Sequence, residues 1–269
     1  MQIIFKNNKL TKNSSRPLAA QRAFKGRFLS KFRVLAEFIL YLPAATEFGV
    51  RCQNTTSVHQ NVRKREPMKR ILVRAKQVIR SMKHSYLDRF VFIHINKTGG
   101  SSVEKALNIP FEHKTALEKI EEIGQKNWDR KFTFTVIRNP WDKVVSHYHY
   151  RVETNQTDLR NNPIEFKEWV KRTYGNQDDF YYNNPKMFMP QTNWIMDNNG
   201  NILVDEIIHF ENLESEFNKI LEKLGKNTTL PHVKKSNREN YQKYYDEETI
   251  EIVRNWFERD IERFDYQFK

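Results

Sequence analysis

The stretch from Val91 to Leu107 constrains the fold of this chain more than any other. Apolar, β-branched and aromatic residues begin at Val91 and stop at Asn96, which predicts a buried strand. Paired glycines and paired serines follow, and the residues after them have the apolar spacing of a helix. This order is typical of a phosphate-binding site, because glycines let the backbone approach an anion and the first N–H groups of the helix point at it.

The polar residues of this loop supply further groups for an anion. Lys97 carries a positive charge on a flexible stem, and it precedes the glycines. A Walker A loop has its lysine after the last glycine, so we do not expect that ATP-binding loop here. A plain surface turn between a strand and a helix is the alternative interpretation. The candidate phosphate ligands are Lys97, Thr98, Gly99, Gly100, Ser101 and Ser102.

A second strand-to-helix junction carries residues that can bind another phosphate. Residues 131–137 alternate in the manner of a core strand, which leads into Arg138. Pro140 stands where a helix can begin, so Ser146 is expected about two turns into it. Arg holds phosphate through two parallel hydrogen bonds, and Ser can add one more. Two separate phosphate-binding motifs are what a 3′,5′-bisphosphorylated nucleotide requires. The alternative is a buried arginine in an ion pair beside a packed serine.

Taken together, the two motifs resemble those of sulfotransferases that use 3′-phosphoadenosine-5′-phosphosulfate (PAPS). Phe92–Ser102 resembles their 5′-phosphosulfate loop, although the carbohydrate branch usually has Pro where this chain has Asn96. Residues 136–146 resemble their 3′-phosphate motif, and residues 230–268 resemble their C-terminal segment. The resemblance covers residues 90–268 and is much more specific than either motif alone.

This resemblance implies a P-loop-like, three-layer α/β fold with a central parallel sheet flanked by helices. It implies transfer of a sulfuryl group from PAPS to a hydroxyl, usually of a carbohydrate, with no metal required. Lys97 and the glycine-rich loop would then hold the 5′ phosphosulfate, and Arg138 and Ser146 would hold the 3′-phosphate. The loop expected to close over the nucleotide carries Lys235, Ser236 and Arg238.

The acceptor hydroxyl of such a reaction needs a general base, and histidine titrates in the suitable pH range. His113 is the first candidate, since relatives often have a histidine before Thr-Ala at this place. Glu112 is the second candidate. A surface or packing role for His113 is the alternative interpretation, and His94, within the predicted strand, is expected in the core.

Charge divides the chain into two parts. Residues 1–89 hold 20 Lys and Arg against 4 Asp and Glu, a net charge of +16, whereas residues 90–269 hold 26 against 29, a net charge of −3. We predict a basic, partly helical or disordered N-terminal extension over 1–84 and a sulfotransferase domain over 85–269. The high overall pI is therefore a poor argument for nucleic-acid binding.

Two other classes of function stay open at this point. One is a non-enzymatic protein that binds RNA or a membrane surface through residues 1–89. The other is a kinase-like P-loop protein that uses the same loop with another nucleotide. The sequence leaves the acceptor and the oligomeric state open.

The cellular location is predicted from the most apolar window, residues 34–50. This window contains Glu37, Pro43 and Glu47, and a spanning helix needs about 20 apolar residues with few or no charges. We therefore expect a cytoplasmic protein, with a Golgi or other membrane anchor over 34–50 as the alternative and with peripheral membrane contact through the basic extension. Cys52 is the single cysteine, which excludes an internal disulfide.

The remaining segments are predicted from their periodicity. Aromatic residues within 151–190 indicate either an acceptor-binding surface or loop-rich packing. The predicted elements are a helix over 68–82 that packs on the domain, a helix over 117–123, strands over 202–204 and 207–210, a helix over 212–224 that stops at Gly225, and one long helix over 249–264.

Overall fold

Three strands form a parallel sheet in the order β1–β2–β3. In this computed structural model, which describes residues 73, 75–231 and 239–269, Phe92 of β1 pairs with Phe134 of β2. Phe134 pairs in turn with Glu206 of β3. The strands are β1 (Phe90–Ile93), β2 (Phe132–Ile137) and β3 (Glu206–His209). The strands predicted before Asn96 and over 131–137 are thus present, and the first ends two residues earlier than expected.

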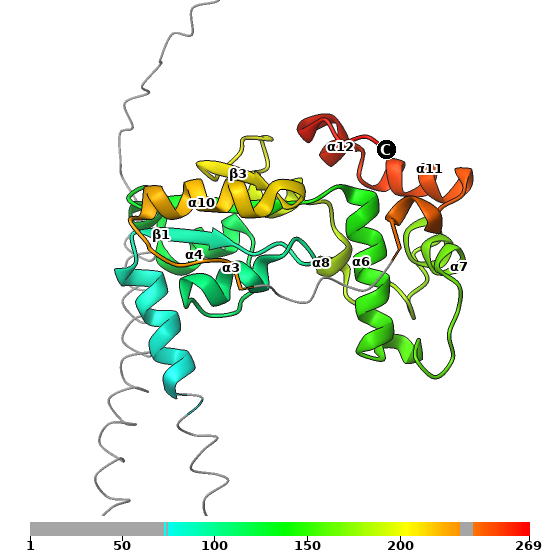
Figure 1. Cartoon of the computed structure of the whole chain (residues 1–269), viewed down its shortest axis with the longest axis horizontal. Helices are drawn as coiled ribbons and strands as arrows, with labels where there is room; N and C mark the ends of the chain where they lie inside the picture. The colour runs from blue at the N-terminus through cyan, green and yellow to red at the C-terminus, as the bar shows by residue number, and fades with distance from the viewer. Residues whose placement is uncertain (1–72, 74, 232–238) are drawn as a thin grey trace, which may run out of the picture. The chain divides into compact units, whose positions relative to one another are not determined.

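Helices connect the strands and continue the chain after them (Figure 1). Their bounds are η1 (Lys83–Leu87), α3 (Gly100–Leu107), α4 (Ala116–Ile123), α5 (Gln125–Trp128), α6 (Pro140–Glu153), η2 (Gln156–Asp158), α7 (Phe166–Val170), η3 (Lys171–Gly175), α8 (Pro185–Phe188), α9 (Thr192–Ile195), η4 (Phe210–Asn212), α10 (Leu213–Leu224), η5 (Tyr241–Tyr244), α11 (Glu247–Trp256) and α12 (Glu258–Phe264). The helices predicted over 117–123 and 212–224 are confirmed as α4 and α10.

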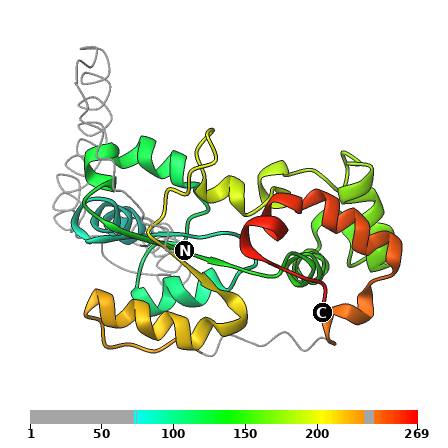
Figure 2. The same cartoon turned by 90° about the horizontal axis from the view of Figure 1, so that it is seen from above.

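Both faces of the sheet are buried by helices (Figure 2). Phe90 and Phe92 point to one face and pack with residues of α3 and α10. Val91 and Ile93 point to the other face and pack with residues of α4, α5 and α9. Successive side chains of a strand alternate in this way, and a parallel sheet covered on both faces has apolar strands throughout. The predicted α/β fold, with a parallel sheet flanked by helices, is confirmed.

A second hydrophobic core is built from helices beyond the carboxyl end of β1 (Figure 1). Trp141 of α6, Trp169 of α7 and Phe257 after α11 are buried together there. The aromatic residues of 151–190 mostly belong to this core, since Tyr174 and Phe188 are also buried. The packing interpretation of that segment therefore explains most of its aromatic residues, whereas Phe180 is exposed.

Two predicted elements are wrong. Residues 202–204 are not a strand, since Ile202 forms only an isolated antiparallel bridge with Met196. The carboxylate of Asp197 accepts backbone N–H groups of the turn that joins them, and Leu203 donates its N–H to the carbonyl of Ile195 (2.8 Å) rather than to the parallel sheet. The long helix over 249–264 is broken at Phe257, whose backbone has φ −107° and ψ 22°. Apolar spacing does not reveal a break of one residue.

The N-terminal prediction falls mostly outside the described residues, and the division into 1–84 and 85–269 stays a prediction. Residues 75–82 are helical, but Val78 and Ile79 are 42% and 53% exposed. This part of the helix predicted over 68–82 therefore does not bury its apolar face against the sheet. The window 34–50 lies outside the described residues. Among the helices that the structure does describe, none combines the length and the hydropathy needed to cross a bilayer.

Candidate functional site

The glycine-rich loop that follows β1 has the backbone of an anion-binding turn. Lys97 and Gly99 have positive φ angles of 66° and 84°, and Gly99 is the N-cap of α3, which receives no side-chain capping bond. The first N–H groups of α3 are therefore available in the geometry that favours a phosphate. Thr98 is buried, and its hydroxyl donates to the carbonyl of Ile95 (2.8 Å). The Thr98 side chain thus closes the loop, while Ser101 is exposed and Ser102 is half-buried.

Gly100 lets this loop rest directly on the imidazole of His94. A Cβ atom at position 100 would lie 2.0 Å from Cδ2 of His94, which is far inside van der Waals contact. His94 is buried, as predicted, and its Nδ1 lies 2.8 Å from a carboxylate oxygen of Glu104. The tight turn of the loop therefore depends on a glycine at this position.

Lys97 points from the loop toward α6. Its Nζ lies 4.3 Å from the centre of the Tyr150 ring, a cation–π distance. Tyr150 is one helical turn beyond Ser146 on α6, so the Lys97 side chain and Ser146 share one region of the molecule. The half-buried Ser146 lies on the helix that was predicted to begin at Pro140, and that helix is confirmed.

Arg138, in the second predicted phosphate-binding motif, contacts the glycine-rich loop, which is the first. Its Nη1 donates to the backbone carbonyl of Lys97 (2.8 Å). Its Nε donates to the carboxylate of Asp142 (2.8 Å), and its Nη2 lies 2.6 Å from the same oxygen. The guanidinium also lies 3.9 Å from the centre of the Phe210 ring. Arg138 therefore forms the buried ion pair of the alternative interpretation, and this pair lies directly against the loop, while phosphate binding by Arg138 stays a prediction.

His113 has the geometry of a general base. Its Nδ1 lies 2.9 Å from the carbonyl oxygen of His94, and because a carbonyl only accepts, Nδ1 carries the hydrogen. In the neutral ring, Nε2 then holds the lone pair. Burial lowers the pKa of His113 from 6.5 to about 4, helped by the charge of His94. His113 is therefore neutral at pH 7 and able to accept a proton.

Glu112 is engaged elsewhere. Its carboxylate pairs with Lys119, which is buried, and with Lys114 at 2.9 Å. Burial opposes ionisation of this carboxyl, but the two lysines outweigh burial and lower the pKa of Glu112. A carboxylate held between two ammonium groups is a weak proton acceptor. Glu112 is thus held in ion pairs, whereas Nε2 of His113 keeps its lone pair, and the choice between the two bases stays a prediction.

A buried basic stripe on α6 was not predicted. Lys143, His147 and Arg151 follow one another at single helical turns and are nearly fully buried. Burial lowers the pKa of Lys143 to about 8, against the opposing charge of Asp260. No hydrogen-bond partner of Lys143 Nζ is found among the described residues. Spacing of i, i+4, i+8 marks one helix face, but the sequence gives no sign that this face is the buried one.

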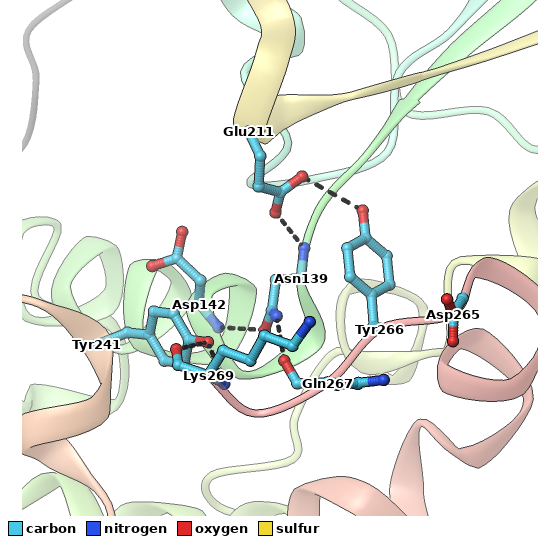
Figure 3. Close-up of a pocket in the computed structure, with 8 residues that line it drawn as sticks. All are labelled: Asn139, Asp142, Glu211, Tyr241, Asp265, Tyr266, Gln267 and Lys269. Carbon is cyan, nitrogen blue, oxygen red and sulfur yellow. Dashed lines mark hydrogen bonds between the residues drawn. The ribbon is translucent and has the colours of Figure 1, made fainter.

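A cavity of about 300 Å³ lies beside Arg138, where the C-terminal segment crosses the start of α6 (Figure 3). Glu211 accepts the backbone N–H of Asn139 (2.7 Å) and contacts the hydroxyl of Tyr266 (3.4 Å). Burial and the charge of Glu211 raise the pKa of Tyr266. The predicted phosphate ligands do not line this cavity, which is bordered by Asn139, Asp142, Glu211, Tyr241, Asp265, Tyr266, Gln267 and Lys269.

The remaining predicted ligands are not placed by the structure. Lys235, Ser236 and Arg238 lie outside the described residues. Across residues 73, 75–231 and 239–269, no group of three or more His, Cys, Asp or Glu side chains is arranged to hold a metal ion. Of the predicted site residues, the structure describes the glycine-rich loop, Arg138, Ser146 and His113.

Comparison with known proteins gives an independent result for this chain. The model described as "Sulfotransferase family" matches residues 82–267, and so includes both phosphate-binding motifs. An uncharacterized protein of Archaeoglobus fulgidus is 32% identical over 105 residues, which are 38% of this chain and 75% of that protein. No solved structure matches.

Proposed function

Since the chain belongs to the sulfotransferase family, which implies PAPS-dependent sulfotransferase activity, we propose that it moves a sulfuryl group from PAPS to a hydroxyl of a carbohydrate. The observation that carries the proposal is the contact between the two motifs, where Arg138 Nη1 lies 2.8 Å from the Lys97 carbonyl. Residues from the ends of two neighbouring parallel strands converge there. In open α/β sheets, ligands bind at the carboxyl ends of the strands.

The residues present fit a bisphosphorylated nucleotide. The loop before α3 offers the backbone N–H groups at the start of that helix, where no side chain caps them. Lys97 and Arg138 each carry a positive charge, and the Arg138 guanidinium lies against the loop at the carbonyl of Lys97. In this proposal the loop and Lys97 bind the phosphosulfate, and Arg138 and Ser146 bind the 3′-phosphate.

The proposed reaction forms a bond between the acceptor oxygen and sulfur while the bond from sulfur to the bridging phosphate oxygen breaks. His113 Nε2 takes the proton of the acceptor hydroxyl. Lys97 and the N–H groups at the start of α3 stabilise the negative charge that develops on the leaving oxygen. As in phosphoryl transfer, positioning and charge stabilisation are expected to supply most of the rate enhancement.

A thermal-shift titration tests the nucleotide site. Adenosine 3′,5′-bisphosphate should raise the melting temperature, because a ligand that binds only the folded state stabilises it by about 2.7 kcal/mol at a hundredfold excess over its Kd. ATP with Mg²⁺ should give a much smaller shift. Transfer of sulfate from PAPS to a panel of hydroxylated carbohydrates then tests the acceptor class.

Two arginine variants complete this test. Arg138→Ala should abolish the shift with the bisphosphate, whereas Arg254→Ala, on the exposed side of α11, should keep it. An equal response of wild type to ATP and to the bisphosphate, or none to either, would contradict the proposed nucleotide. A normal bisphosphate response without transfer to any carbohydrate would contradict the acceptor class alone.

A further inference from the structure

Glu104 connects three parts of the site from the second turn of α3. Its Oε1 lies 2.8 Å from Nδ1 of His94, and the same oxygen accepts the backbone N–H of Glu112 (3.2 Å). The side chains of His94 and Glu104 are only 4% and 5% exposed. This buried carboxylate oxygen therefore contacts two segments of the chain, one at the end of β1 and one after α3.

His94 extends these contacts in two directions. Its ring lies against Gly100 at the start of α3, where no Cβ could fit. Its backbone carbonyl accepts from Nδ1 of His113 (2.9 Å), and the two imidazole rings have centres 4.3 Å apart. The side chain of His94 thus touches the glycine-rich loop, and the backbone carbonyl of the same residue orients His113.

We propose that Glu104 is a positioning residue which, through His94 and the backbone of Glu112, fixes the glycine-rich loop and His113 relative to each other. This inference rests on the proposed function, because it assigns Glu104 to the geometry of sulfuryl transfer. Glu104 touches neither substrate directly. Its role is to hold the glycine-rich loop and His113 at the distance and orientation that in-line transfer requires.

Burial lowers the pKa of His113 to about 4, helped by His94 directly after β1, Lys186 on α8 and Lys143 on α6. Glu104 acts on His113 through hydrogen bonds to His94 and to the backbone of Glu112, so its role is tested through kcat and KM.

Two variants separate geometry from charge. Glu104→Ala removes both hydrogen bonds and should lower kcat by roughly 10- to 100-fold, with KM for PAPS and the thermal shift with the bisphosphate nearly unchanged. Glu104→Gln retains an oxygen for both donors and removes the charge. It should restore most of the wild-type kcat, because the hydrogen bonds and not the charge position the site.

A second histidine–glutamate pair provides the matched control. Glu216 on α10 accepts the backbone N–H of His209 (2.7 Å), and His209 Nδ1 lies 3.3 Å from the same oxygen. Glu216→Ala and Glu216→Gln should leave kcat unchanged.

The outcomes separate this inference from the proposed function. If wild type binds the bisphosphate and transfers sulfate, but Glu104→Ala has wild-type kcat or Glu104→Gln is as impaired as Glu104→Ala, Glu104 is not a positioning residue. If Glu104→Ala does not fold, Glu104→Asp decides alone: its shorter side chain cannot keep both hydrogen bonds, so a wild-type kcat would contradict the proposal. A wild-type protein with neither binding nor transfer contradicts the proposed function instead.

Discussion

The two proposed phosphate-binding motifs are both strand-to-helix junctions, but one is formed by the backbone and the other by a side chain. The junction after β1 is made by backbone geometry, with positive φ at Lys97 and Gly99 and a glycine packed on His94. The junction after β2 is made by a side chain, since Arg138 is held by Asp142 and stacked on Phe210. Asn139 caps α6 there, accepting the backbone N–H groups of the first turn.

This difference indicates which substitutions should disrupt each phosphate-binding motif. The glycine-rich loop is formed by the backbone and depends on the absence of side-chain atoms, so adding one methyl group should deform it. The site at Arg138 depends on charge and on the number of hydrogen-bond donors, so its affinity for phosphate should fall in steps as donors are removed. Three substitutions test this comparison, in order of decreasing effect.

Gly100→Ala should have the largest effect, and it should act on folding as well as on binding. The added Cβ meets the buried ring of His94 at 2.0 Å, and overpacking of this kind costs about 3 kcal/mol. Gly200→Ala is the control, because Gly200 has φ +80° but nothing within 4 Å of a Cβ. It should cost about 1 kcal/mol from strain alone.

Urea denaturation of the two alanine variants gives the comparison through their midpoints. Equal destabilisation of Gly100→Ala and Gly200→Ala would show that only backbone strain matters. The glycine-rich loop would then not depend on its close contact with His94, and the two motifs would differ less than we propose.

Arg138→Lys should have an intermediate effect, confined largely to ligand binding. Lysine keeps the positive charge but loses the fork of parallel donors. A lost hydrogen bond to a charged group costs about 2 kcal/mol, so the Kd for adenosine 3′,5′-bisphosphate should rise roughly 30-fold. Isothermal titration calorimetry measures this change. A Kd unchanged by Arg138→Lys would mean that position 138 provides charge only.

Ser146→Ala should have the smallest effect. One neutral donor is removed from a half-buried position on α6, which costs about 1 kcal/mol, or roughly fivefold in Kd for the bisphosphate. The same titration applies, and the melting temperature without ligand should stay within the error of wild type. A larger loss than that of Arg138→Lys would reverse our ranking within the second motif.

Much of the site could be predicted because it is local in sequence. The loop before α3 and the start of α6 are each marked by short-range signals, namely glycines after a strand and a proline at the first helical position. The groups that sequence reasoning missed are Asp142, Glu104 and Glu211. Asp142 lies in the first turn of α6, four residues after Arg138, which precedes the helix. Glu211 lies in η4, two residues after β3 ends, and its contact with Asn139 spans 72 positions.

The sequence by itself determined the two strand-to-helix junctions and their order, because apolar runs, helix spacing and turn residues act over a few neighbouring positions. The parallel α/β fold was implied by the resemblance of these motifs to the sulfotransferases. Tertiary structure alone decided which groups meet. It brought Arg138 to the carbonyl of Lys97 and placed His113 against His94, across separations of 41 and 19 positions. Such contacts depend on how the elements pack around a shared core, and no local pattern encodes that packing.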